Sequence, residues 1–253
     1  MDFGLSAAQT ALSAQSDALS AWGDNLANSS TPGFQGDVPT FTEALRQNLP
    51  SSPWGQALAG TTAASVSMGA GTIVATRQDA TPTGATATGR ALDVAVNGPG
   101  YLVLESGGQR LLTRDGSLSF DAQGRLVDPT GAFVLSTLGT PIQVPPGTPV
   151  EIVNGNVLVG GRTVATIAVA QVPNPGGLTR VGGSHLLPGA QSGAARVGAP
   201  KPGQLLTGYL DLSSTSMAQT MTGLVTSETG FELAAKVAQQ AAQLATLTAQ
   251  IPG

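Results

Sequence analysis

The chain has no cysteine and only one histidine, and both shortages limit the chemistry that it can carry. Without cysteine it has no disulfides, no thiolate nucleophile and no zinc site of the cysteine type, so the sequence gives no information about redox compartment. A Ser-His-Asp triad would have to use His185, which lies in the segment GGSHLLPG with no acidic residue within twenty positions. We therefore expect His185 to be an ordinary loop residue and the protein not to be an enzyme.

Charged and aromatic side chains are also scarce, at 10% and 4% of the 253 residues. The net charge is -4 and there are only 11 Lys and Arg, so no basic stripe is available to bind nucleic acid. Asp115, Asp121 and Asp128 recur near turn glycines, where Asp commonly bonds its own backbone; we favour this interpretation over a calcium site. We expect no metal and no cofactor.

Long apolar runs are missing as well. No window approaches about 18 consecutive apolar residues, so we expect no insertion into a membrane. The N-terminal MDFGLSAAQTALSAQ has no Lys or Arg before its apolar residues and does not resemble a Sec signal peptide, so we expect export, if it occurs, to use another route. The 34 glycines and 17 prolines make up less than the roughly 25–30% typical of disorder, which indicates a turn-rich globular chain.

Both ends of the chain carry a helical pattern. The first runs from residue 3 to 27, and the second from 217 to 251. Each contains a heptad-like seam, which predicts coiled-coil-like packing. The N-terminal seam consists of Leu5, Leu12, Leu19 and Leu26, with Ala8 and Trp22 at the alternate positions and Gln15 interrupting them. The C-terminal seam consists of Leu233, Val237, Gln240, Leu244, Leu247 and Ile251.

The two ends are expected to need partners. Four buried leucines contribute at most about 12 kcal/mol, whereas ordering about 25 residues of backbone costs on the order of 25 to 50 kcal/mol. Isolated helices are marginal in water, and the low charge of these segments indicates several protein-facing sides. Each end therefore packs against the other, or against other copies of the chain; pairing within one monomer as an antiparallel helical hairpin stays an open alternative.

Between the ends the hydrophobic period changes to two, which is typical of strands. YLVLESGGQRLLTRDG predicts a hairpin around Gly107-Gly108, and SLSFDAQGRLV predicts another with its turn at residues 121–124. VEIVNGNVLVGGRTVATIAVAQV predicts three strands with turns at Asn154-Gly155 and Gly160-Gly161. Together these segments predict an antiparallel meander, followed by a loop-rich segment at 173–204.

The predicted fold is therefore α+β, with long N- and C-terminal helices forming a coiled-coil-like terminal domain around a central antiparallel β-rich domain. The expected divisions are an N-terminal helix and junction at 1–34, an extended connector with possible short strands at 35–90, the β-rich domain at 91–209, and the C-terminal helix at 210–253.

Five segments, in this order along the chain, resemble the flagellar basal-body rod and hook family. They are DNLANSSTPGF (24–34), LDVAVNGPGYLVL (92–104), LTRDGSLSFDAQGRLVDPTGAFVL (112–135), GYLDLSS (208–214) and ETGFELAAKV (228–237). The length of the chain favours a rod subunit, proximal or distal, over a full-length hook protein. The Ser-Thr-Pro-Gly-Phe spelling leans slightly toward the proximal type.

The resemblance implies a structural subunit that polymerises through its terminal helices into the hollow drive shaft of the flagellum, which transmits torque and passes exported subunits. It also implies export through the flagellar type III apparatus and an extracytoplasmic location in the basal body. The implied partners are other copies of the chain, neighbouring rod or hook proteins and the export apparatus. The terminal segments would become ordered on assembly, when burial against neighbours offsets the entropy of ordering.

The residues expected to serve assembly combine the two seams with the positions that match the family. Asn25, Asn28, Thr31, Gly33 and Phe34 match the N-terminal motif, and Gly230, Phe231, Glu232 and Lys236 match the C-terminal stretch. The chain departs from the family at Ser214-Thr215-Ser216 and at Glu228 to Phe231. The second departure puts in doubt the contact between subunits that the family would make at this part of the C-terminal helix. The full set is Leu5, Leu12, Leu19, Trp22, Asn25, Leu26, Asn28, Thr31, Gly33, Phe34, Phe231, Glu232, Leu233, Lys236, Val237, Leu244 and Leu247.

Three alternatives stay open at this point. The chain is a hook-type axial protein of the same family, a monomeric β-rich binding or adhesin-like domain whose ends form a private hairpin, or an esterase-like enzyme that depends on His185. A further question concerns Phe34, which docks either within its own subunit or on the next one.

Overall fold

A computed structural model of the chain describes residues 2–43, 72–78 and 84–249. The chain divides into two compact units. The first, here the helical unit, comprises Met1–Asp24, Val38–Arg77 and Ala218–Gly253. The second, here the β unit, comprises Asn25–Asp37 and Gln78–Met217. The prediction of terminal helices flanking a central antiparallel β-rich region is confirmed.

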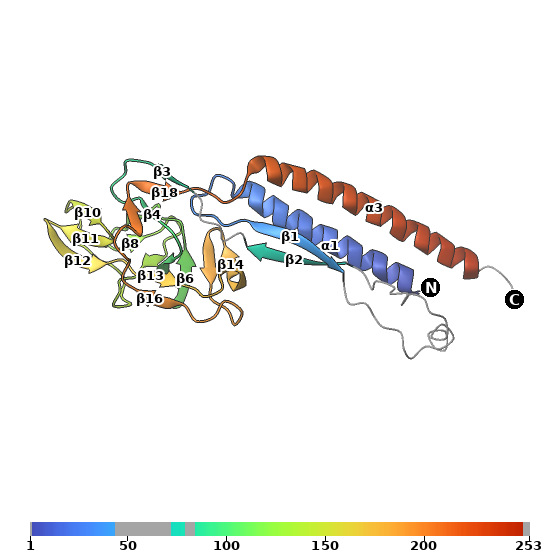
Figure 1. Cartoon of the computed structure of the whole chain (residues 1–253), viewed down its shortest axis with the longest axis horizontal. Helices are drawn as coiled ribbons and strands as arrows, with labels where there is room; N and C mark the ends of the chain where they lie inside the picture. Colours follow the sequence, from blue (N-terminus) through green and yellow to red (C-terminus); the bar gives the residue numbers. More distant parts are fainter. Residues whose placement is uncertain (1, 44–71, 79–83, 250–253) are drawn as a thin grey trace, which may run out of the picture. The chain divides into compact units, whose positions relative to one another are not determined.

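The helical unit contains the two terminal helices, α1 (Asp2–Ala27) and α3 (Met217–Ala249). The start of α1 and the end of α3 lie at the same end of the pair (Figure 1). The unit also contains a two-stranded sheet of β1 (Asp37–Glu43) and β2 (Thr72–Gln78), which fall in the segment expected to be an extended connector. α1 ends before Pro32, whose ring cannot continue a helix, in turns closed by Ser29 N to Leu26 O (3.3 Å) and Thr31 N to Asn28 O (3.0 Å).

The β unit is built from many short strands, as its frequent glycine turns require. In chain order they are β3 (Ala85–Ala87), β4 (Val94–Val96), β5 (Tyr101–Ser106), β6 (Gln109–Thr113), β7 (Ser119–Phe120), β8 (Leu126–Val127), β9 (Phe133–Val134), β10 (Val150–Val153), β11 (Asn156–Val159), β12 (Arg162–Thr166), β13 (Val169–Gln171), the short helix η1 (Pro175–Gly177), β14 (Thr179–Gly182), β15 (His185–Leu187), β16 (Arg196–Gly198), β17 (Leu205–Thr207) and β18 (Tyr209–Asp211).

The predicted hairpins are present. β5 pairs with β6 around Gly107 and Gly108, both with positive φ (58° and 77°), and β7 pairs with β8. β10, β11 and β12 form a separate three-stranded antiparallel sheet. The main sheet has the order β14-β15-β6-β5-β9-β8-β7, and β13 joins β5 to β16. Two further pairs, β17-β4 and β18-β3, join strands far apart in the sequence.

Strand β5 lies at the centre of the β unit and is covered on both faces. Leu102 and Leu104 belong to one buried cluster, whereas Tyr101 and Val103 belong to a second one. Successive side chains of a strand point to opposite faces, so β5 separates two layers of core. The sequence predicted the strand, but not that apolar residues cover it on both sides.

The regularly spaced aspartates stabilise turns, as expected. Asp115, Asp121 and Asp128 each accept a hydrogen bond from a backbone N–H two residues further on, from Ser117 (2.9 Å), Gln123 (2.9 Å) and Thr130 (3.0 Å). Each carboxylate thus satisfies a donor that its own turn would otherwise leave unpaired. Over the described ranges, no group of three or more His, Asp or Glu is placed to hold a metal ion.

His185 is not the loop residue that the sequence suggested. It begins strand β15, and its Nε2 lies 2.6 Å from Oδ2 of Asp128, 57 positions away. The hydrogen bond to Asp128 raises the pKa of His185, although burial lowers it; the charges of Asp128 and Asp115 act in the same direction as the bond. Burial would raise the pKa of Asp128, but hydrogen bonds from His185, Thr130 and the Ala132 N–H lower it. The expectation failed because neighbours along the chain do not reveal neighbours in space.

Neither α1 nor α3, the two long helices of the described ranges, has the length and apolar character that crossing a membrane requires.

Candidate assembly site

The two terminal helices pack through glycines of α3 that face large side chains of α1. A Cβ atom at Gly223 would lie 2.4 Å from Cε2 of Trp22, and one at Gly230 would lie 2.8 Å from Nε2 of Gln15. The α3 positions rise by seven residues while the α1 positions fall by seven, so the helices run antiparallel. The alternate positions of the N-terminal seam therefore face α3, and Gly230, a departure from the family pattern, makes room for Gln15.

The contact between the helices is lined by small side chains. Ala14, Ala18 and Ala21 of α1 are buried, and so are Thr220 and Ser227 of α3. Small residues let two helix backbones approach closely, but each removes little apolar surface from water. The predicted leucines of α1 are only half-buried: Leu12, Leu19 and Leu26.

The described residues of the predicted C-terminal seam are exposed. Leu233 is 65% exposed and Val237 49%, and Phe231, Glu232 and Lys236 are exposed as well. The side chains of Leu5, Leu244 and Leu247 fall outside the described ones. Further apolar residues of α3 with large exposed fractions are Met217, Met221 and Val225. α3 thus carries apolar side chains that the described part of its helical unit leaves exposed.

The residues of the N-terminal motif lie in the β unit, and the first of them, Asn25, is hydrogen-bonded to Asp37. The Asn25 amide donates to the backbone oxygen of Asp37 (2.7 Å) and accepts from the Asp37 N–H (2.8 Å). Asn25 is only 3% exposed, so both bonds form away from water. This pairing closes the chain between residues 25 and 37 into a loop.

The next motif residues organise the inside of that loop. Thr31 Oγ1 donates to Asn28 Oδ1 (3.2 Å), and Ser213 Oγ donates to the Asn28 carbonyl (3.2 Å). Gly33 has φ of 64°, and its N–H donates to the Asp211 carbonyl (2.9 Å). A Cβ atom at Gly33 would lie 2.2 Å from the carbonyl carbon of Arg114, so only glycine fits there.

Phe34 docks within its own subunit, which answers the question that the sequence left open. It is 1% exposed, and the guanidinium of Arg180 lies 4.3 Å from the centre of its ring. Arg180 also approaches Asp37 (Nε to Oδ2, 3.3 Å) and donates to the backbone oxygen of Gln35. The Gln35 side chain accepts from the Tyr101 hydroxyl (3.2 Å). The Asp37 carboxylate and the Gln35 carbonyl hold the Arg180 guanidinium above the ring, and this cation fixes the ring in place.

A buried ion pair between Arg114 and Asp211 supports the loop at residues 25–37. Arg114 Nε lies 3.0 Å from Asp211 Oδ2, with the two side chains 4% and 2% exposed. The same guanidinium donates to the carbonyls of Val96 (2.6 Å) and Gly98 (3.0 Å). Burial raises the pKa of Asp211, against the lowering effect of the Arg114 charge. Because both partners are out of water, removal of either would leave an uncompensated charge.

Sequence reasoning missed the three residues that hold this loop. Arg114 and Asp211 stand inside the quoted segments LTRDG and GYLDLSS, but 97 positions separate them and nothing in either segment points to the other. Arg180 lies in the segment expected to be loop-rich, where it belongs to strand β14. Only the charge itself was a signal: these are three of the few charged residues in the chain.

Two protein families match parts of the chain. Residues 5–35 match the family described as "Flagella basal body rod protein", and residues 95–162 match "Flagellar hook protein FlgE/F/G D1 domain". The first range contains most of α1 and the N-terminal motif; the second begins in β4 and ends in β12. The matched segments therefore include the loop around Phe34 and most of the predicted hairpins.

Full-length similarity extends to curated proteins of several bacteria. The "Flagellar basal-body rod protein FlgG" of Bacillus subtilis is 29% identical over 238 residues, which cover 87% of each chain. The FlgG of Caulobacter vibrioides is 29% identical over 260 residues and 98% of each chain. The "Flagellar basal-body rod protein FlgF" of Rhizobium meliloti is 29% identical over 234 residues, covering 89% of this chain and 87% of its own.

Proposed function

The chain belongs to the flagellar basal-body rod protein family and is a structural, non-enzymatic subunit of the rod; from this premise we propose that it polymerises through its terminal helices. Membership implies assembly with other rod and hook proteins. We propose in addition that the assembled helices form the wall of a hollow shaft that transmits torque and passes exported subunits, and that the chain reaches the rod through the type III apparatus.

The apolar side chains that α3 leaves uncovered carry this proposal. Leu233 and Val237 are 65% and 49% exposed, although the surrounding helix has few charges to keep it soluble. Exposed apolar rows on a low-charge helix are typical of surfaces that a partner covers. Burial of one such side chain contributes about 1.5 to 3 kcal/mol, so a few of them suffice to favour association.

The motif residues take a different role in this proposal. Asn25, Gly33 and Phe34 are buried within the β unit, where their hydrogen bonds and the Arg180 contact are satisfied in the same chain. We propose that they shape the loop that follows α1, whereas Leu233, Val237 and the half-buried leucines of α1 contact neighbouring subunits. The chain then divides by role at about the junction between residues 24 and 38.

Charge substitutions on α3 test the proposal. We expect the full chain with Leu233→Asp and Val237→Asp to fold normally, since both side chains point to water, but to fail to enter rods and restore motility in a strain that lacks the native gene. The control carries the same two charges at exposed polar positions of α3, as Thr226→Asp and Gln239→Asp, and is expected to support motility. Normal rods with the first variant would refute the proposed helix contacts.

One observation favours a second candidate, a monomer whose ends form a private pair. Gly223 and Gly230 fit Trp22 and Gln15 in the same chain, so the helices have a specific contact without a partner. In that case α1 and α3 would be as stable in dilute monomer as the β unit. The rod proposal expects them to gain most of their stability on assembly.

A further inference from the structure

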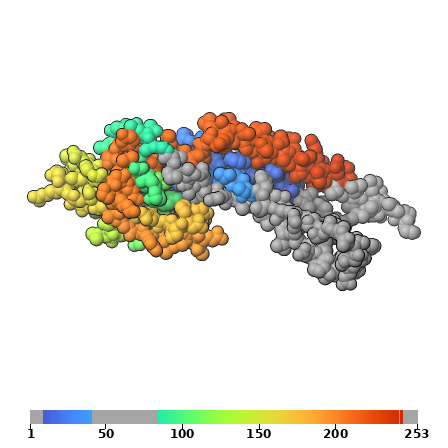
Figure 2. Space-filling model, viewed as in Figure 1, coloured from blue at the N-terminus to red at the C-terminus, as the bar shows by residue number. Residues whose placement is uncertain are grey.

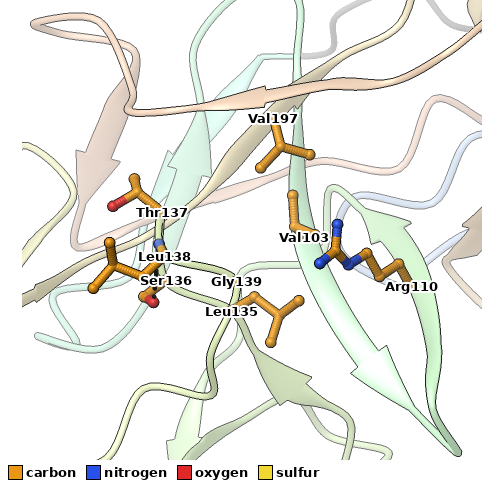
Figure 3. A pocket seen from close by; sticks show the side chains of 8 residues that line it. All are labelled: Val103, Arg110, Leu135, Ser136, Thr137, Leu138, Gly139 and Val197. Carbon is orange, nitrogen blue, oxygen red and sulfur yellow. Dashed lines mark hydrogen bonds between the residues drawn. The ribbon is translucent and has the colours of Figure 1, made fainter.

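A small pocket opens on the β unit at the end of one face of the main sheet. It encloses about 170 Å³ and is formed by Val103 of β5, Arg110 of β6, Val197 of β16 and the turn at residues 135–139. Figure 3 shows the Arg110 guanidinium aimed toward Val103 and the middle of the pocket. The floor is apolar, because Val103 and Leu135 belong to the second buried cluster.

Arg110 has no partner of its own in the described part of the chain. In the same unit Arg90, Arg114, Arg125 and Arg180 form ion pairs, with Asp93, Asp211, Asp121 and Asp37 respectively, whereas Arg110, Arg162 and Arg196 form none among the described residues. Arg110 stands opposite Glu105 of β5 in the strand register without forming an ion pair with it. Arg110 instead lies against the turn, with one guanidinium nitrogen 3.3 Å from where a Cβ of Gly139 would stand. Of the arginines without an ion pair, Arg110 is the one that lines this pocket, and a guanidinium above an apolar floor is suited to binding a carboxylate.

Two exposed apolar side chains stand at the pocket, beside Ser136 and Thr137 of the turn. Leu138 is 88% exposed at the tip of the turn, and Val197 is 44% exposed on the outermost strand. Backbone hydrogen bonds of 2.8 Å, from Gly139 N to Ser136 O and from Ser136 N to Thr140 O, close the turn. The turn thus holds Leu138 in water beside the exposed Val197, so the two side chains form a small apolar surface next to Arg110.

A second surface of the same unit has the complementary chemistry. On β10, Glu151 is the one exposed acidic residue in the described part of the β unit, and it forms no ion pair there. Val153 stands two residues further along and is 48% exposed, so a carboxylate and an apolar side chain share one face of the strand. β10 is an outer strand of its three-stranded sheet, with one edge unpaired.

We propose that Glu151 and Val153 of one copy dock on the pocket of the next copy, with the carboxylate on Arg110 and the valine against Leu138 and Val197. This contact rests on the proposed function, since it adds a second, β-layer contact to polymerisation through the helices. Its two surfaces differ, so the contact is heterologous and repeats from copy to copy, the arrangement that builds open helical assemblies. The charge pair fixes the register of the contact, and the apolar residues exclude water from it.

Because the chain has no cysteine of its own, disulfide cross-links between copies can form only at introduced cysteines. A full chain with Leu138→Cys and Val153→Cys, incorporated into rods and oxidised, is expected to give a ladder of dimers, trimers and longer species. Chains with either substitution alone are expected to stay monomeric, and a mixture of the two single variants to stop at dimers. The control pairs Leu138→Cys with Val164→Cys. Val164 is also exposed, but it lies on β12, at the opposite edge of the three-stranded sheet from β10. A ladder from the control, self-linking of the Leu138→Cys chain, or a cross-link to a different protein would overturn the proposal.

Charge reversal provides an independent measurement. We expect Arg110→Glu and Glu151→Arg each to lower the number of copies per purified basal body about tenfold, and the double variant to restore it to within about twofold. Arg162→Glu, an exposed arginine outside the pocket, serves as the matched control and is expected to have no effect. A double variant no better than the worse single variant contradicts the contact. If the chain with Leu233→Asp and Val237→Asp still fails to assemble in that case, the result supports polymerisation through the helices and refutes only the contact between Arg110 and Glu151.

Discussion

The helical unit and the β unit differ in what they bury. The β unit encloses large side chains, among them Leu102, Leu104 and Leu126, each at 0% exposure, whereas α1 and α3 meet where Gly223 and Gly230 face Trp22 and Gln15, and the other buried residues of these helices are mostly Ala, Thr and Ser. A fully buried leucine contributes about 1.5 to 3 kcal/mol and a single methyl group less than about 1 kcal/mol. The β unit therefore has a core that supports it alone, while the helices keep their larger apolar residues on the outside.

This difference assigns the two units different roles. A unit with its core filled folds before it meets partners, and a unit with uncovered apolar residues gains stability from them. Substitutions that act on one unit and spare the other test the division.

The largest effect is expected in the β unit, from Asp211→Ala. The substitution leaves the Arg114 guanidinium buried without its partner, which costs about 3 to 5 kcal/mol. We expect urea to unfold the strands at a much lower concentration, as measured by circular dichroism. Glu151→Ala, which removes an exposed carboxylate without an ion pair, is the control and should leave the midpoint in place. Equal midpoints for both variants would show that the ion pair does not support the unit.

A smaller loss of stability is expected from Gly33→Ala, which alters the loop around Phe34. The alanine meets the Arg114 backbone and must adopt a positive φ, at a cost of about 2 to 4 kcal/mol. Gly23→Ala is the matched control, because a Cβ there has open space in a helix and is expected to stabilise α1 by about 0.5 to 1 kcal/mol. Opposite shifts of the urea midpoint are the expected result; loss in both variants would contradict the description of the loop.

In the helical unit, Gly223→Leu is expected to weaken the contact between α1 and α3 by about 2 kcal/mol, since the new side chain meets the Trp22 ring and only part of the cost is recovered by helix propensity. Thr226→Leu places the same side chain at an exposed position of α3 as control. Measured on assembled rods, in which the helices are expected to be protected, hydrogen exchange should accelerate along both helices in the first variant alone, with the strands unchanged. Faster exchange in the strands as well would show that the two units unfold together.

The smallest effect, about 1 kcal/mol, is expected from His185→Gln, and it depends on pH. The raised pKa of His185 means that its contribution is fully present below the ordinary value of 6.5 and is lost as the pH rises through the folded value. The lowered pKa of Asp128 means that the carboxylate contributes above 3.8 and is lost as the pH falls through its folded value. The difference in free energy of unfolding between wild type and variant should therefore be largest at about pH 4 to 6.5 and shrink above it. Asp115, whose charge also acts on His185, is present in both proteins. A difference that grows at alkaline pH would refute the pairing.

Much of this arrangement was predictable from periodicity. The heptad spacing indicated both helices, and the change to a period of two, with Gly-Gly and Asn-Gly turns, indicated the hairpins β5–β6 and β10–β11–β12. These signals are local, and each needs only a few neighbouring residues. The turn-capping role of Asp115, Asp121 and Asp128 was predictable for the same reason.

The contacts that hold the loop around Phe34 were not predictable, because they join distant positions. Arg180 and Gln35 are 145 residues apart, and Arg114 and Asp211 are 97 apart. Periodicity also misjudged which residues of α3 face α1: large apolar residues indicated the seam, but the contact is made by Gly223, Ser227 and Gly230. A pattern of apolar residues shows which side of a helix avoids water, and it does not show whether the same chain or another covers that side.

Hydrogen exchange on dilute monomer and on assembled rods tests the central claim most directly. The account predicts fast exchange throughout residues 3–27 and 217–249 in the monomer, slow exchange in the strands of the β unit, and strong protection of both helices only in the rod. Helices protected in the monomer as strongly as strand β5, with no gain on assembly, would contradict it.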